Sequence, residues 1–145
     1  MLPRGHILWG AILTVVFYFI FPEIGAVGLT LIFLSSFLID FDHYVNSVLN
    51  TGKISLSESF WYHERLAKVE EYENKRGIRR KGDFHLFHTL EFHILIGLLG
   101  FFWVGFFYIF VGMVFHSLLD VYSLIRDDKF YRREFFFFNW LRRKF

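Results

Sequence analysis

Residues 94–115 read ILIGLLGFFWVGFFYIFVGMVF, an apolar block without a single charged side chain. One helix across this block would separate His88 from His116 by about 42 Å at 1.5 Å per residue. Two shorter helices joined by a turn near residues 100–105 would instead return the chain to the side from which it entered. The topology of the whole chain depends on which of these two arrangements it adopts.

Two earlier apolar blocks cover residues 7–21 and 24–39, and Pro22-Glu23 separates them. Because 54% of the 145 residues are hydrophobic and they gather in blocks rather than alternating with polar residues, the composition indicates a membrane protein. A bilayer core of about 30 Å requires roughly 20 helical residues. We therefore expect both helices to tilt or to extend into the flanking residues 2–6 and 41–48.

A signal peptide is an alternative interpretation of the N-terminus, because Arg4 precedes an apolar run. No small-x-small cleavage site follows this run, however, and a second apolar block does, so we favour a retained membrane helix. The chain has no cysteine, which excludes disulfides and thiolate metal ligands.

Positive charge is confined to three places in the sequence. The 16 lysines and arginines lie at Arg4, within residues 53–81 and within residues 126–144. The positive-inside rule puts all three on the cytoplasmic side if the apolar blocks form two helical hairpins, with a turn near residues 100–105. We therefore predict an all-α, four-helix, multi-pass protein of the cell membrane with both termini in the cytoplasm.

The remaining segments lie outside the apolar blocks. Residues 51–82 are predicted to form a cytoplasmic connection with an amphipathic helix that has a capping box at Ser55 and Glu58 and ends near Gly77. Residues 126–145 mix aromatic residues with cations, as interfacial anchors do. The domain organisation is thus one membrane-embedded domain, residues 1–125, followed by an interfacial tail.

Polar side chains converge on the cytoplasmic end in this topology. Carboxylates and imidazoles near membrane spans are costly and usually face a partner or a cavity. His116 and Asp120 are spaced i, i+4 and share a helix face, while Asp42 points away from Asp40. The candidate metal ligands, contributed by each of the four helix ends, are His6, Asp40, His43, His85, His88, His116 and Asp120.

Imidazole nitrogen and carboxylate oxygen suit a divalent metal, with zinc preferred and iron or manganese as alternatives. The number of ligands allows one or two ions, and two ions could hold the attacking and leaving oxygens of a phosphoester. Asp42 or Glu91 could serve as the general base or could orient a ligand histidine. These are the candidate catalytic residues.

Simpler interpretations exist for individual residues. His6 could lie at the headgroup level, and His116 with Asp120 could form only a hydrogen bond between helices. We expect His63 at the surface and His93 to be a buried, hydrogen-bonded histidine rather than a ligand.

Two other classes of function remain for the whole chain: a metal-binding or transport protein without catalysis, and a structural membrane protein. Transport is less favoured because the helix centres carry few polar residues. Residues 53–81 contain eight cations but also five glutamates, and topology explains this excess, so nucleic acid is not an expected partner.

The order of these elements resembles the YdjM-like family of membrane-bound metal-dependent hydrolases. Members carry an N-terminal membrane histidine, an Asp-x-Asp-His after the second span, a histidine-rich segment before the third and a late His-x-x-x-Asp. Here the matching residues, from His6 to Asp120, are His6, Asp40, Asp42, His43, His85, His88, His116 and Asp120. The third element departs from the family pattern because no arginine follows His85. The resemblance extends distantly to zinc-dependent phospholipase C and implies hydrolysis of a phosphoester, with membrane lipid as substrate or partner.

Overall fold

The computed structural model describes residues 3–144, and every regular element among them is helical. Met1, Leu2, where the first helix was expected to begin, and Phe145, the end of the predicted tail, lie outside the described residues. The longer helices are α1 (Pro3–Ile20), α2 (Gly25–Leu38), α3 (Phe41–Thr51), α4 (Leu56–Lys75), α5 (Leu90–Leu99), α6 (Val104–Arg126) and α7 (Phe137–Lys144). Three short 3-10 helices connect them: η1 (Pro22–Ile24), η2 (Leu86–His88) and η3 (Phe130–Arg132).

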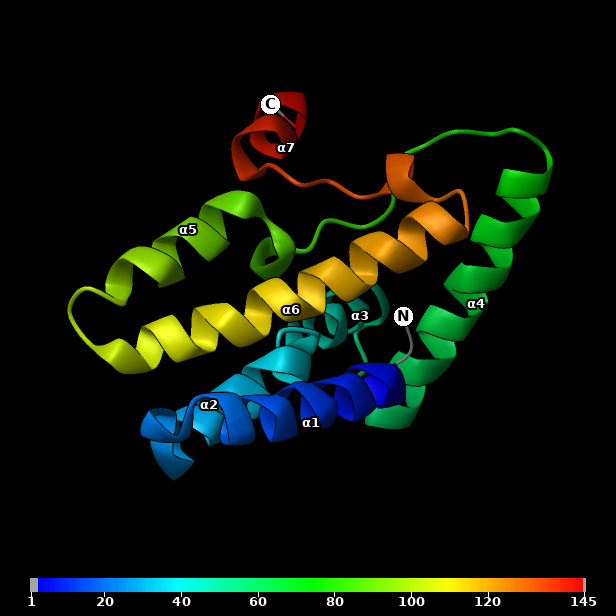
Figure 1. Ribbon diagram of the computed structural model, residues 1–145. Coiled ribbons are helices and arrows are strands. Elements are labelled where there is room, and N and C mark those ends of the chain that lie inside the picture. The colour runs from blue at the N-terminus through cyan, green and yellow to red at the C-terminus, as the bar shows by residue number, and fades with distance from the viewer. Residues whose placement is uncertain (1–2, 145) are drawn as a thin grey trace.

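The apolar blocks fold as two helical hairpins (Figure 1). The chain reverses through η1 between α1 and α2, where Pro22 opens the 3-10 turn. It reverses again between α5 and α6, because α5 ends at Leu99 and α6 begins at Val104. The turn expected near residues 100–105 is therefore confirmed, and a single long helix through residues 94–115 is excluded.

Helices α2 and α6 form the central pair, with α1 packed on α2 and α5 on α6. Small residues allow this close approach, as at helix contacts in membranes. A Cβ added at Gly112 would collide with the backbone oxygen of Ile32 and the hydroxyl of Ser35, and one at Gly10 would collide with the hydroxyl of Ser36. Both contacts hold the C-terminal half of α2 against its neighbours.

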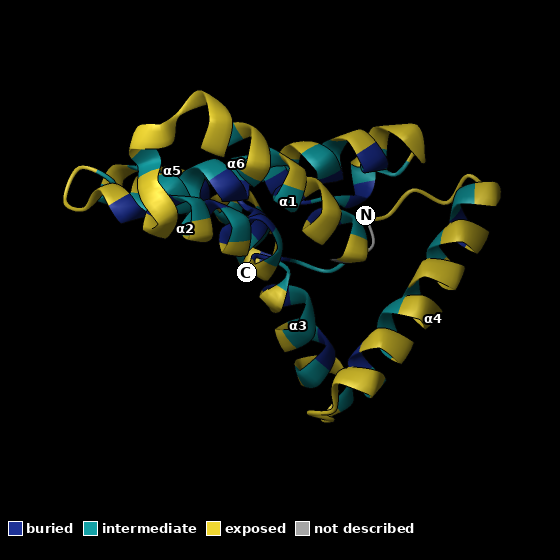
Figure 2. Cartoon of the chain, turned by 60° about the horizontal axis from the view of Figure 1, so that its bottom comes forward, coloured by how far each residue is buried: buried dark blue, intermediate teal, exposed yellow. Residues whose placement is uncertain are grey.

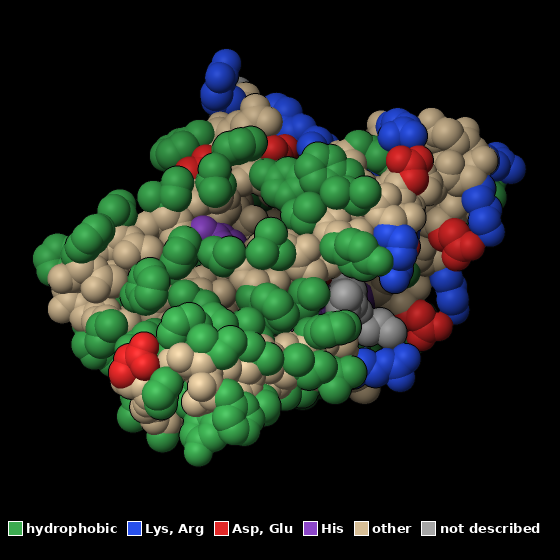
Figure 3. Space-filling model, viewed as in Figure 1, with side chains coloured by type: hydrophobic (Ala, Val, Ile, Leu, Met, Phe, Trp, Pro, Cys, Tyr) green, Lys and Arg blue, Asp and Glu red, His purple; other side chains and the backbone are tan. Residues whose placement is uncertain are grey.

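The burial pattern is the reverse of that in a water-soluble protein. Among residues 3–144, the buried hydrophobic side chains are Ile32, Ile39 and Met113, whereas the buried polar set is larger and includes most of the histidines. Hydrophobic side chains cover the surface of the hairpins, and charges gather toward α4 and the C-terminal segment (Figure 3). Exposed apolar surface on this scale marks a surface that contacts something other than water.

Two helical stretches are long and apolar enough to cross a membrane. They are Pro22–Thr51, which joins η1, α2 and α3, and Val104–Arg126. The apolar parts of α1 and α5 are shorter. The prediction of an all-α chain with membrane-crossing helices is thus supported for two stretches, and a four-span arrangement remains a prediction.

The connecting segment forms α4, a helix that packs on α3 at one end and projects from the hairpins (Figure 2). Ser55 has the extended backbone of an N-cap residue, but its hydroxyl bonds to Ser57 and Glu58 pairs with Lys53, so the predicted capping box does not form. Gly77 has a φ of +69°, as a residue that follows a helix C-terminus often does.

The C-terminal segment folds back onto the hairpins. Leu90 donates its backbone N–H to the carbonyl oxygen of Phe135 at 2.8 Å, and Arg132 pairs with Glu73 of α4 at 2.7 Å. These contacts hold the segment between α4 and α5. An interfacial role for it remains a prediction.

We expect Gly112→Ala to lower the free energy of unfolding by about 1–3 kcal/mol, because the added methyl group meets the Ile32 carbonyl oxygen of the facing backbone as well as the Ser35 hydroxyl. Gly97→Ala is the matched control, since its Cβ would lie 3.4 Å from the Phe110 ring, an ordinary contact. Thermal unfolding of both purified variants in detergent measures the difference. Equal midpoints would contradict the close packing of α2 on α6.

Candidate metal centre

The candidate ligands come together where several elements end. His6 lies near the start of α1, Asp40 in the break between α2 and α3, His88 at the end of η2, and His116 with Asp120 in the second half of α6. At this break the backbone bonds join residues three apart, from the Asp40 N–H to the Phe37 carbonyl oxygen and from the His43 N–H to the Asp40 carbonyl oxygen. All of these side chains except Asp40 are buried, and Asp40 is half-buried.

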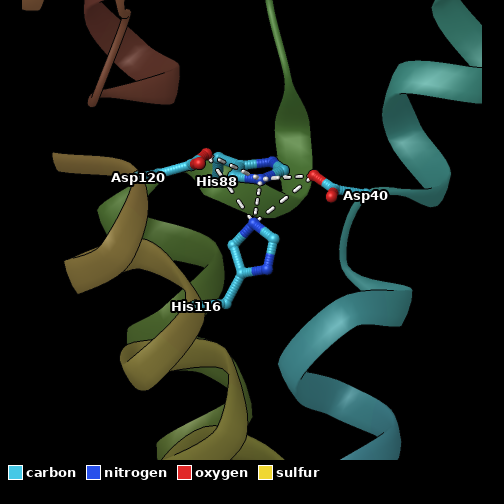
Figure 4. Close-up of side chains that lie close together, drawn as sticks. All are labelled: Asp40, His88, His116 and Asp120. Atoms are coloured by element: carbon cyan, nitrogen blue, oxygen red, sulfur yellow. Dashed lines mark hydrogen bonds and ion pairs between the residues drawn. The ribbon is translucent and has the colours of Figure 1, made fainter. Parts of the chain in front are cut away.

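Four donor atoms face one another at the centre of this cluster (Figure 4). Nε2 of His88 and Nε2 of His116 are 3.2 Å apart. Oδ1 of Asp40 lies 3.5 Å from the first nitrogen and 3.4 Å from the second. Oδ2 of Asp120 lies 3.8 Å and 3.7 Å from the same two atoms.

These separations match the edges of a small coordination polyhedron. Zinc bonds of about 2.0–2.2 Å in tetrahedral geometry place the ligand atoms roughly 3.3–3.6 Å apart. The five distances above, 3.2–3.8 Å, lie close to that range. The group Asp40, His88, His116 and Asp120 can therefore hold a metal ion.

Contacts behind the two histidines set which nitrogen faces the centre. His116 Nδ1 lies 2.8 Å from the carbonyl oxygen of Ser36, which can only accept, so Nδ1 carries the proton and Nε2 is left to bind. His88 Nδ1 lies 3.1 Å from Oδ2 of Asp42, and the same oxygen accepts the backbone N–H of Phe87 at 2.9 Å. A carboxylate or carbonyl behind a ligand histidine is the usual support at metal sites.

His6 lies beside the four donors. Its ring is fully buried and stacks on the His116 ring with centroids 3.8 Å apart. Nε2 lies 3.2 Å from Oδ1 of Asp120 but lacks hydrogen-bond geometry, and neither ring nitrogen has a hydrogen-bond partner among residues 3–144. His6 therefore contacts the same Asp120 carboxylate whose other oxygen is one of the four donors.

A second group shares His88 with the first and consists of Asp42, His43 and His88. The predicted ligand His85 lies next to it: its ring contacts the His43 ring with centroids 3.7 Å apart, and its Nδ1 lies 3.1 Å from Nδ2 of Asn46. Burial, followed by the charge of His43, lowers the pKa of His85 well below its usual value. The neutral ring has a lone pair available, but His85 belongs to neither group of donors.

Two residues expected near the centre have other partners. The Glu91 carboxylate accepts the backbone N–H groups of Phe137 and Phe138 at the start of α7, so it fixes that helix rather than joining the donors. His93 donates to the carbonyl oxygen of Thr89 and bonds to Ser117 at 2.9 Å, as expected for a hydrogen-bonded histidine. We therefore do not assign Glu91 a role as general base.

His63, expected at the surface, is half-buried on α4, and its Nε2 lies 3.0 Å from the carbonyl oxygen of His43. This contact joins the projecting helix α4 to the first turn of α3.

Arg133 is a site residue that the sequence analysis missed. Its guanidinium donates from Nη2 to Oδ2 of Asp120 at 2.6 Å, and it is nearly buried. The positive-inside rule by itself accounts for the basic residues after residue 125. No sequence spacing links Arg133 to α6. Only the return of the C-terminal segment brings it to the centre.

Comparisons of the chain with models of protein families, with curated proteins and with solved structures find no match. The assignment of a function therefore depends on the residues and on the geometry of the centre.

We expect Asp42→Asn to weaken metal binding about 10–100-fold, because the amide no longer holds His88 as a carboxylate does. Competition with a chromophoric zinc chelator measures both affinity and stoichiometry. Asp83→Asn, which changes a carboxylate bonded to Tyr62 on the projecting segment, is the control. A drop from two bound ions to one would instead make Asp42 a ligand of a second ion, and unchanged affinity would contradict either role.

Proposed function

We propose that the protein is a membrane-bound metal-dependent hydrolase that acts on a phosphoester of a lipid or of another membrane-associated substrate. The observation that carries the proposal is the set of four donor atoms from Asp40, His88, His116 and Asp120. Their separations of 3.2–3.8 Å are those of metal ligands, and their supporting contacts leave both imidazoles ready to bind.

The donors favour zinc. Two imidazole nitrogens and two carboxylate oxygens are all donors that zinc binds, and a fifth position, which zinc can add, would be left for water or substrate. Iron and manganese accept the same donors and are the alternatives. The overlapping group of Asp42, His43 and His88 allows a second ion, with His85 beside it.

When bound, such a metal supplies Lewis-acid chemistry, because it polarises a phosphoryl oxygen and acidifies water. The chain's own residues prepare the site for it. Asp42 holds the ring of His88, and the Ser36 carbonyl holds that of His116. Arg133 anchors Asp120 and brings a positive charge to the centre, where it favours an anionic substrate.

A membrane location is supported by the outer surface of the helices. Large hydrophobic side chains are exposed on the helices and their turns. The most exposed of them include Phe19, Val27, Phe101 and Phe102. The charged segments gather at the end that carries the metal centre. We propose four membrane crossings by α1, α2, α5 and α6, with both termini and the centre on the cytoplasmic side.

The likeness to the YdjM-like family supports the same proposal. The family elements that it matches supply His6, Asp40, Asp42, His43, His88, His116 and Asp120, and these residues adjoin one another in space. The chain departs from the family pattern at His85, which no arginine follows. His85 also belongs to neither of the two donor groups.

The protein purified in detergent is expected to contain one or two equivalents of a transition metal, measured by inorganic mass spectrometry. Asp40→Ala and His116→Ala each remove a donor, so both are expected to lose at least one equivalent while keeping the helical circular dichroism spectrum. Asp127→Ala, an exposed aspartate paired with Arg126 at the end of α6, is the matched control and should retain full metal.

Hydrolysis is tested on the same samples with bis(p-nitrophenyl) phosphate and with a panel of lipid phosphoesters. Activity that chelation removes and zinc restores is the expected result. Bound metal without turnover of any phosphoester would favour the non-catalytic metal-binding alternative. A folded protein that takes up no zinc, manganese or iron would contradict the metal centre itself.

A further inference from the structure

A groove of about 270 Å³ runs between α5 and α6 and ends at the metal centre. Its walls are formed by apolar side chains of both helices, among them Ile94, Phe110, Leu118 and Leu124. Figure 3 shows histidine atoms at the bottom of a hollow between hydrophobic side chains in this region. This volume lies just below the range of ~300–1,000 Å³ typical of small-molecule sites, so the groove suits one slender apolar group.

The polar groups of the groove lie at one end or are already paired. His88, Asp120 and Arg133 line the end shared with the metal centre. His93 and Ser117 also line the groove, but they bond to each other at 2.9 Å. An occupant that enters along the apolar walls therefore meets the charged and imidazole groups of the metal centre only at that end.

Arg133 gives that end its charge preference. Nη2 is bonded to Asp120, whereas Nη1 is buried and has no hydrogen-bond partner among residues 3–144. A guanidinium with spare donors in a sheltered position is a strong site for phosphate. The polar end of the groove therefore complements an anionic headgroup.

We propose that the groove binds a single acyl chain of a lipid and places the anionic phosphate headgroup of that lipid between Arg133 and the metal centre. This inference deepens the proposed function, on which it rests, by assigning a substrate class. A peptide fits the groove less well, because the apolar walls offer no partners for its backbone N–H and carbonyl groups. A lipid enters from the bilayer without leaving an apolar environment.

The proposal is tested with two probes that share one alkyl chain carrying a diazirine near its end. One probe ends in a non-hydrolysable phosphonate and the other in an alcohol. The full-length protein, reconstituted in phosphatidylcholine nanodiscs with and without zinc, is irradiated, and the labelled residues are mapped by mass spectrometry.

We expect labels on the groove walls, with the phosphonate probe competing about tenfold better than the alcohol probe. Val121→Trp fills the groove and should reduce labelling by both probes, whereas Ile125→Trp, an exposed position on the same helix outside the groove, should not. Arg133→Gln should abolish the preference for phosphonate but retain labelling by the alcohol.

Labels spread evenly over the outer faces of the helices would overturn the groove as a lipid site. Equal labelling by the two probes in the zinc-loaded wild-type protein would overturn the anionic headgroup. Metal content, measured on each sample, separates the two proposals. Groove labelling in a protein that binds no zinc would leave the groove intact and remove the hydrolase, and zinc binding without groove labelling would do the reverse.

Discussion

The structure depends on the need to pair buried carboxylates and imidazoles inside an otherwise apolar set of helices. Isolated charges in such a place cost several kcal/mol, so they persist only when each has a partner. The contact of His116 Nδ1 with the Ser36 carbonyl oxygen joins α6 to α2 at the point where the polar cluster begins. Gly112 and Ser35 permit that approach one turn earlier. Apolar packing of the central helices and ligand geometry are therefore set by the same few residues.

The C-terminal segment completes the cluster and links it to the exposed elements. Arg133 pairs with Asp120 at the centre, and its neighbour Arg132 pairs with Glu73 of the projecting helix α4. Glu91 fixes the start of α7 through two backbone N–H groups. One stretch of chain thus connects the centre, the groove and α4. This continuity gives Arg133 a role in the site as well as in topology, because it brings a cation beside the Asp120 carboxylate.

Much of this arrangement could be predicted from the sequence because apolar blocks and helical spacing are local properties. The break at Pro22, the turn after Leu99 and the convergence of His6, Asp40, His88, His116 and Asp120 follow from block lengths and from the i, i+4 rule. Asp42 was expected to point away from Asp40, but both carboxylates reach the His88 ring, Asp40 at Nε2 and Asp42 at Nδ1, because α2 ends at Leu38 and α3 begins only at Phe41. Arg133 and the partner of Glu91 could not be predicted, because each meets its partner only through the return of a segment whose path no local pattern specifies. The capping box at Ser55 was wrong because the Ser55 hydroxyl bonds to Ser57 and the Glu58 carboxylate pairs with Lys53 instead of with the backbone N–H groups.

We propose that two histidines and two aspartates from three places in the fold, the break between α2 and α3, η2 and α6, hold one metal ion. X-ray absorption spectroscopy of the zinc-loaded protein tests it most directly, because it reports the ligand atoms around the metal. We expect about four nitrogen or oxygen neighbours at roughly 2.0–2.1 Å, with the outer-shell scattering of two imidazole rings. A spectrum of a six-coordinate ion surrounded by oxygen alone, without imidazole scattering, would contradict ligation by His88 and His116.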